Sequence, residues 1–339
     1  MWKWNKETAR TWYEKQPLYG GANFVPSNAS NQLEMWQKAT FDPYLIEKEL
    51  KWASQLGMNL MRVYLHDLVW HEDAKGFKNR INTYLEIADR YGIKTCFVLF
   101  DDCWNPNPQL GPQKDPIPYT HNSRWVQSPG IAIVNNPAEW GRLEAYVKDI
   151  LETYKDDERI LFWDLYNEPG NGPQGDDTGK GRLQRNKSLP LLKATFKWAR
   201  SVSGVTQPMT AGVWKRTFDF AKLNKFMLEQ SDIITFHSYV RPGKLKKIIR
   251  KYAALGRPMI CTEFMCRPLS TFKESLPIFK EHKIGAINWG LVVGRSNAIY
   301  PWGWNKKKGN PNPYFHDVLQ PTGEMLYEKE KKYIKDFFK

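Results

Sequence analysis

The chain has 339 residues, of which 41% are hydrophobic and 25% are charged, so it can bury a large core, and its composition excludes a disordered protein. The net charge of +14 comes from 50 basic and 36 acidic residues, but the basic residues are scattered over expected helix faces without a nucleic-acid-binding motif beside them. We therefore expect a solvated surface and no nucleic-acid partner; attraction to an acidic glycan is the other interpretation. No stretch approaches the ~18 apolar residues that a membrane-spanning helix needs, so no membrane association is expected.

The N-terminal segment and the cysteines bear on the cellular compartment. The first residues, from Met1 to Glu7, lack the apolar core of a secretory signal. The protein is therefore expected in the cytoplasm, or as a mature secreted or periplasmic form whose leader has been removed. The four cysteines form no C-x-x-C pair, and two of them fall in expected core strands, so buried free thiols are expected rather than metal ligands or a disulfide framework. These cysteines are Cys96, Cys103, Cys261 and Cys266.

Short apolar runs alternate with longer amphipathic segments along almost the whole chain, a pattern that predicts repeated β-α units and a parallel sheet. The expected strands span residues 18–24, 59–65, 94–100, 160–166, 209–213, 233–237, 259–262 and 286–291. The expected helices span residues 43–56, 77–91, 138–154, 189–202, 244–255, 271–283 and 323–338. Eight strands with helical crossovers predict an α/β protein with one (β/α)8 TIM barrel, forming a single domain over residues 1–339 after an extension of about residues 1–17.

An open, doubly wound sheet is the competing architecture, because periodicity alone does not show whether a sheet closes. That architecture predicts a glycine-rich phosphate loop after the first strand. Residues 20–23 do not fit the G-x-G-x-x-G pattern, and residues 175–181 miss the spacing of a P-loop. The barrel is therefore favoured.

Three insertions follow expected strands. They span residues 101–135, 170–187 and 293–312. All three come after the C-terminal ends of strands, which is the face where barrel enzymes keep their chemistry. The first and the last could close one end of a cleft, which slightly favours short or terminal substrates.

Two glutamates stand at the ends of apolar runs. Glu168 follows Asn167 after the fourth expected strand, and Glu263 ends the seventh. They are 95 positions apart (263 − 168), which is three β-α units at roughly 30 residues each, so they should face each other across the barrel mouth. Two such carboxylates are what acid/base cleavage of a glycosidic bond requires. The alternatives are a surface turn for Glu168 and a buried ion pair for Glu263.

With these motifs the chain resembles a retaining glycoside hydrolase of clan A, the TIM-barrel group that includes family 5 cellulases and mannanases. The resemblance implies that Glu168 is the acid/base and Glu263 the nucleophile, with Asn167 binding the sugar 2-hydroxyl. In a retaining enzyme the two carboxyl groups should lie ~5–5.5 Å apart, and a gap of ~8 Å would indicate inversion. The resemblance also implies supporting roles for Arg62 on the second strand, His237 and Tyr239 on the sixth, and Trp289 on the eighth.

Each supporting residue has a structural alternative: Arg62 could only neutralise a core carboxylate, His237 could be a core histidine, and Trp289 could be barrel packing. The end of the third strand, Phe100 to Trp104, departs from the polar pattern of a family 5 endoglucanase, so the glycone subsite is expected to differ. Further candidates for contact with substrate stand at strand ends or in the long loops. They are Asn23, His66, Asp102, Trp104, Trp214 and Trp302.

The predicted function is hydrolysis of a β-linked oligo- or polysaccharide by double displacement, with a carbohydrate as the binding partner. Neither a cofactor nor a metal is expected, because no metal-binding pattern such as H-E-x-x-H occurs. The alternative is a non-catalytic carbohydrate-binding barrel derived from such an enzyme. Mannan, glucan, xylan, galactan and acidic glycans stay open as substrates, as do exo versus endo action and the oligomeric state.

Overall fold

The computed structural model describes residues 3–171 and 180–339, with side chains described outside residues 180–187. Its centre is one sheet of eight parallel strands in the order β5-β4-β3-β2-β1-β8-β7-β6. The strands are β1 (Gly20–Asn23), β2 (Leu60–Tyr64), β3 (Lys94–Val98), β4 (Ile160–Asp164), β5 (Met209–Thr210), β6 (Ile234–Ser238), β7 (Met259–Phe264) and β8 (Gly285–Trp289). An isolated parallel bridge links Val213, three residues beyond β5, to Phe236 on β6. The predicted (β/α)8 barrel is confirmed.

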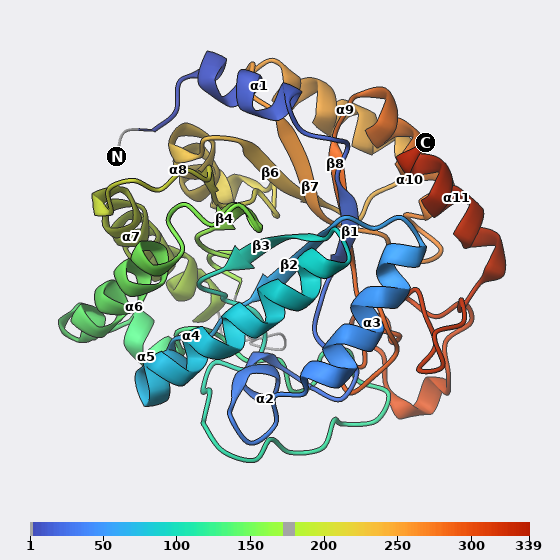
Figure 1. The fold of residues 1–339 in the computed structure, drawn as a ribbon, viewed down its shortest axis with the longest axis horizontal. Helices are drawn as coiled ribbons and strands as arrows, with labels where there is room; N and C mark the ends of the chain where they lie inside the picture. The colour runs from blue at the N-terminus through green and yellow to red at the C-terminus, as the bar shows by residue number, and fades with distance from the viewer. Residues whose placement is uncertain (1–2, 172–179) are drawn as a thin grey trace.

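Helices alternate with the strands and surround them (Figure 1). The α-helices are α1 (Lys6–Glu14), α2 (Gln32–Trp36), α3 (Pro43–Gln55), α4 (Asp67–Arg90), α5 (Ile131–Val134), α6 (Trp140–Thr153), α7 (Lys180–Ser201), α8 (Ala221–Gln230), α9 (Pro242–Ala253), α10 (Phe272–Glu281) and α11 (Glu328–Phe338). Short 3-10 turns are η1 (Pro137–Glu139), η2 (Phe218–Phe220) and η3 (Lys306–Lys308). Tyr91 caps α4, and the chain then turns at Gly92 with a φ of 68°, as expected of glycine after a helix.

Several strands end earlier than their apolar runs predict. β4 stops at Asp164 although Leu165 and Tyr166 are buried and apolar, and β5 covers only residues 209–210. Hydrophobic periodicity indicates which residues are buried, but not which ones form hydrogen bonds to a neighbouring strand. Buried residues that follow a strand into the barrel mouth are therefore predicted as part of it. In the opposite direction, β7 runs on to Phe264, and Glu263 therefore lies inside the strand.

Two helices begin earlier than predicted. α4 starts at Asp67, ten residues before the expected start, and is kinked at Asp73, whose φ/ψ values are not helical. α7 starts at Lys180 rather than at residue 189. The expected insertion at 170–187 therefore ends in a helix, and its residues 172–179 lie outside the described part of the chain.

Helix α1 covers the N-terminal end of the barrel. Trp12 and Tyr13 pack against a cluster of inward-facing side chains from the lower parts of the strands, and the Tyr13 hydroxyl donates to the Lys283 carbonyl at 3.0 Å. Figure 1 shows α1 at one end of the molecule and the long loop after β3 at the other. The C-terminal mouth of the barrel is thus the open end.

The four cysteines are free and buried, which confirms that prediction. Within residues 3–171 and 180–339, no helix combines the length and apolar character that crossing a bilayer requires.

Candidate active site

Glu168 lies in a tight turn just beyond β4. Its backbone has a φ of 45°, a conformation that non-glycine residues adopt at a cost. Asp102 holds this turn in place because its carboxylate accepts hydrogen bonds from the Tyr166 hydroxyl at 2.7 Å and from the Gly170 amide at 2.6 Å. The Glu168 carboxylate in turn accepts from Asn171 Nδ2 at 2.6 Å. The sequence's apolar strand followed by a polar corner thus becomes a strained turn that presents a carboxylate to the mouth.

Cys103 is a second neighbour of Glu168. Its thiol lies 3.3 Å from Glu168 Oε2 and also 3.3 Å from Asn167 Nδ2. Asp101 orients both, since one of its carboxylate oxygens accepts from the Cys103 amide at 2.9 Å and from Asn167 Nδ2 at 2.9 Å. The Asp-Asp-Cys segment after β3 therefore supports the turn after β4 from one side.

Glu263, on β7, is surrounded by donors. Its Oε1 accepts from Arg62 Nη1 at 3.0 Å and from the Tyr64 hydroxyl at 3.0 Å, and its Oε2 accepts from the Tyr239 hydroxyl at 2.9 Å. A carboxylate with a guanidinium and two hydroxyl donors is stabilised in its ionised form. The residue is 5% exposed, so these partners replace nearly all of its contact with water.

Arg62 connects the parts of the site below its surface. The side chain is fully buried, and besides Glu263 it donates to Asp164 Oδ2 at 2.8 Å, Asn167 Oδ1 at 2.7 Å and Asn23 Oδ1 at 2.7 Å. Two carboxylates around one guanidinium satisfy its fork of donors. Strands β1, β2, β4 and β7 are therefore tied together beneath the glutamates.

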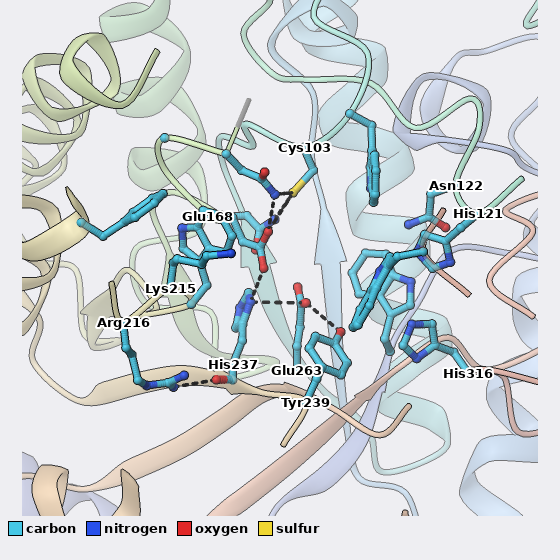
Figure 2. Close-up of a pocket in the computed structure, with 18 of the residues that line it drawn as sticks. Cys103, His121, Asn122, Glu168, Lys215, Arg216, His237, Tyr239, Glu263 and His316 are labelled. Carbon is cyan, nitrogen blue, oxygen red and sulfur yellow. Dashed lines mark hydrogen bonds and ion pairs between the residues drawn. The ribbon is translucent and has the colours of Figure 1, made fainter. Parts of the chain in front are cut away.

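His237, on β6, lies between the two glutamates. Its Nδ1 is 2.7 Å from Glu168 Oε1 and 3.3 Å from Glu263 Oε2. Figure 2 draws these two contacts as dashed lines. One ligand atom from each of these three residues lies within 4.8 Å of the others, which brings the two carboxyl groups close enough to contact one sugar ring.

This donor set could also hold a metal ion. The guanidinium of Arg62 touches Glu263, and its positive charge opposes a cation at this place.

Burial dominates the electrostatics of the site. It raises the pKa of Glu168, against the hydrogen bonds from Cys103 and Asn171. It also raises the pKa of Glu263, against the attraction of His237 and Arg62 and together with the repulsion of Glu168. Burial lowers the pKa of His237 to about 4, so this imidazole is neutral at pH 7. Two coupled carboxyl groups in such a place titrate as a pair, one after the other.

The glutamates open into a cavity of about 440 Å³, which is the size of many ligand sites. Among the residues proposed from the sequence, nine line it. They are Trp104, Asn167, Glu168, Trp214, His237, Tyr239, Glu263, Trp289 and Trp302.

Four proposed residues lie behind the cavity wall. Arg62 and Asn23 belong to the hydrogen-bonded layer under Glu263, and Asp102 supports the Glu168 turn. His66 is fully buried; its Nδ1 accepts from the Leu68 amide at the start of α4, and its Nε2 lies 3.1 Å from the Gln127 carbonyl. The structure therefore gives His66 the position of a helix cap and not a position in the cavity wall. Residues after strand ends can cap the following helix, and the sequence pattern does not separate the two roles.

The cavity has further lining residues that the sequence did not single out. They are Cys103, His121, Asn122, Gly170, Asn171, Lys215, Arg216, Phe220, Val240 and His316. For Cys103 a signal existed, since it follows two aspartates at the end of β3. His121, Asn122 and His316 stand far from any strand end in their loops, where no periodic pattern marks them.

No family model matches the chain, and no curated protein matches it in sequence. Solved structures do match. A GH5_18 enzyme from Streptomyces cattleya, solved with Manβ1-4GlcNAc, has a TM-score of 0.61 and 13% identity over 95% of this chain and 80% of that one. The endo-1,4-β-mannanase from Rhizomucor miehei has a TM-score of 0.58 and 15% identity, covering 95% and 94%. The exo-β-1,4-mannosidase Op5Man5 from an Opitutaceae bacterium has a TM-score of 0.59 and 16% identity, covering 95% and 59%.

These likenesses show that the chain shares the TIM-barrel fold of these glycoside hydrolases. Sequence identities of 13–16% support the same fold but not the same activity, which has to be inferred from the residues of the site.

Proposed function

We propose that the protein is a retaining β-glycoside hydrolase in which Glu168 is the acid/base and Glu263 the nucleophile. The observation that carries the proposal is the pair itself: the partly buried carboxylate of Glu168 just beyond β4 and the buried carboxylate of Glu263 on β7 have one oxygen each within 4.8 Å of the other, but they have different partners. That spacing fits direct attack by one carboxylate better than a mechanism that places water between the two.

The different partners support different protonation states. Arg62 lies against Glu263, so the ionised form is favoured there, and no guanidinium contacts Glu168 in the described structure. Burial already raises the pKa of Glu168, and once Glu263 is ionised its negative charge opposes ionisation of the neighbouring Glu168. One group can then attack while the other donates, which is the division of labour that glycoside cleavage needs.

The steps follow from these states. Glu263 attacks the anomeric carbon while Glu168 gives its proton to the leaving oxygen, so the glycosidic bond breaks and a glycosyl ester forms. Glu168, now ionised, takes a proton from water, and that water attacks the anomeric carbon and releases Glu263. Trp289, at the cavity wall, offers an apolar ring face to the sugar, and Asn167 holds its amide at the mouth through bonds to Arg62 and Asp101.

The test is substitution of each glutamate by glutamine. Glu168→Gln and Glu263→Gln should each lower turnover of an aryl β-glycoside by several orders of magnitude and leave the unfolding temperature within the range of an exposed control, Glu158→Gln. Because the structural neighbours described above include a mannanase and a mannosidase, aryl β-mannosides come first, before glucosides, xylosides and galactosides.

Two further measurements address the mechanism. A 2-deoxy-2-fluoro glycoside should label Glu263 covalently, which mass spectrometry of the peptide would detect, and the first sugar released should keep the β configuration in an NMR time course. Near-normal turnover in either glutamine variant would refute the assignment. Release of the α anomer would replace retention with inversion.

A further inference from the structure

Asn122 is a buried polar side chain without a partner. It is 1% exposed, lies in the long loop after β3, and lines the cavity that holds the glutamates. Neither its Nδ2 nor its Oδ1 has a hydrogen-bond partner among the described residues. Leaving a buried amide unpaired costs about 1–3 kcal/mol per group, so such a side chain points to a partner that is not part of the protein.

The backbone at this position supports the same conclusion. Asn122 has a φ of 43°, and Trp104, in the same loop, has a φ of 67°. Left-handed conformations at non-glycine residues cluster where a structure holds a side chain for a function. The loop is fixed in this shape, because the Asn122 carbonyl accepts from the Trp125 amide at 3.0 Å and Trp125 Nε1 donates to buried Asp101 at 2.7 Å.

Two histidines beside Asn122 offer acceptors. His316 Nδ1 pairs with the Met265 carbonyl at 2.6 Å, so Nδ1 carries the proton and Nε2 has a free lone pair; no described residue binds it. His121 Nδ1 pairs with the Tyr300 carbonyl at 2.8 Å in the same manner, which leaves its Nε2 as an acceptor. Burial lowers the pKa of His121 to about 4 and that of His316 as well, so both rings are neutral at pH 7.

Aromatic rings complete this part of the wall. The ring of His121 packs edge-on against Trp104 at 5.6 Å and against Trp302 at 6.2 Å, and Trp302 packs against Tyr239 at 5.0 Å. Tyr239 is also the residue that donates to Glu263. Figure 2 shows Asn122, His121 and His316 on one side of the glutamates, with Lys215 and Arg216 on the other.

We propose that Asn122, His121 and His316 form a subsite for the hydroxyl groups of a neutral sugar, on the glycone side of Glu263. A hydroxyl group donates to an imidazole lone pair and also pairs with either atom of an amide, so a polyol satisfies all three side chains. A carboxylate or sulfate does not, because the lone pairs of both imidazoles would face its negative charge and no cationic side chain lines this end in the described chain. The aglycone then extends toward Lys215, on the far side of Glu168.

The assignment of this subsite to the glycone side rests on the proposed function. The binding of a neutral sugar can be tested without catalysis. The variant is Asn122→Gly, since glycine adopts the same backbone conformation without strain and removes the amide. The matched control is Asn136→Gly, an exposed asparagine that follows the same loop and makes no side-chain cap bond. Thermal unfolding of both variants checks the fold.

The experiment measures kcat/KM for p-nitrophenyl β-glycosides of mannose, glucose, galactose, xylose and glucuronic acid. For the best neutral substrate, Asn122→Gly should lower kcat/KM by about 10- to 100-fold, and Asn136→Gly should leave it unchanged. The same comparison is then made with the 3-, 4- and 6-deoxy analogues of that substrate. For the analogue that lacks the contacted hydroxyl, wild type and Asn122→Gly should become nearly equal.

Three results would overturn the subsite: equal kcat/KM for wild type and Asn122→Gly on the best substrate, the same loss on every deoxy analogue, or the glucuronide as the best substrate. If no glycoside is cleaved, the proposed function fails, and the subsite is judged from tryptophan-fluorescence titrations with the methyl glycosides. Weaker binding by Asn122→Gly than by Asn136→Gly then supports it, and equal or absent binding refutes it.

Discussion

The thiol of Cys103 lies 3.3 Å from Glu168 Oε2, so a sulfur donor from the loop after β3 contacts the carboxylate that follows β4. This contact lowers the pKa of Glu168, against the larger effect of burial, which raises it. If Glu168 must be protonated for the first chemical step, its pKa sets the alkaline limb of the activity profile.

Replacing the thiol should therefore move that limb. Cys103→Ala removes a donor that favours the ionised carboxylate, so the pKa of Glu168 should rise and the alkaline limb of kcat/KM should shift to higher pH. Cys103→Ser keeps a donor and is the matched control, with a smaller shift. A profile of Cys103→Ala that moves to lower pH would contradict the role of this contact.

Removing Arg62 should cost both stability and activity. The fully buried guanidinium satisfies Asp164 and Glu263, and Arg62→Met would leave these carboxylates unpaired. Breaking a buried ion pair costs about 3–5 kcal/mol, and urea denaturation would measure it. Arg90→Met, at an ion pair whose arginine side chain is 58% exposed, should cost less than about 1 kcal/mol. Equal losses in the two variants would mean that burial of the pair has no effect.

Trp289 should matter for substrate more than for folding. Its ring is 9% exposed, lines the cavity and packs edge-on against Tyr64 and Trp125 at 5.9 and 5.4 Å. Trp289→Ala should lower kcat/KM on aryl glycosides by about 100-fold, since both the stacking surface and the packing are lost. Trp289→Phe keeps a ring face and should therefore retain a higher kcat/KM than Trp289→Ala, at similar stability. Equal kcat/KM values in the two variants would argue against stacking of the ring on the sugar.

Asp317 should make the protein less stable as the pH rises. Both of its carboxylate oxygens are buried without a hydrogen-bond partner in the described chain, and burial raises its pKa to about 8. An unfolded aspartate has a pKa near 3.9, so between about pH 4 and 8 the unfolded state loses a proton that the folded state keeps. The free energy of unfolding therefore falls through this window and levels off above it.

Asp317→Asn stays neutral and removes this dependence. Relative to wild type its free energy of unfolding should rise between pH 5 and 8, on the order of a few kcal/mol, as measured by urea denaturation at both values. The exposed Asp156→Asn should show no such trend. A constant difference between Asp317→Asn and wild type at the two pH values would show that Asp317 is ionised in the folded protein.

The barrel could be predicted because most of its strands lie in buried apolar runs and most of the long helices have one apolar face. The glutamates could be placed on it because strand order fixes which strand ends meet. Hydrophobic periodicity could not predict the residue at which a strand ends its hydrogen-bonded pairing. After Asp164, for example, the following residues stay buried although the strand has ended. The early start of α4 was missed because it depends on a histidine cap and a kink.

Within the site, the position of a residue could be predicted where it lies at or shortly after the C-terminal end of its strand, as for Glu168, His237 and Trp289, all of which line the cavity. Loops have no periodic pattern, so nothing in the sequence indicated that Asn122, 24 residues beyond the end of β3 (122 − 98), lies at the barrel mouth. Its side chain acquires its position from the contacts of Trp125 and Asp101, which only the folded chain brings together. The roles of all these residues in catalysis stay predictions.

Helix α1 and the end of α11 share the face of the barrel opposite the cavity. Tyr13 sits under β8, and Phe338 packs near Gly20 and Gly57, at the lower ends of β1 and β2. Figure 1 shows α1 and α11 away from the long loop after β3. An affinity tag or surface linker attached at either terminus would thus hold the molecule with its mouth facing outward. Protein immobilised in this way should bind a soluble glycoside as readily as protein free in solution.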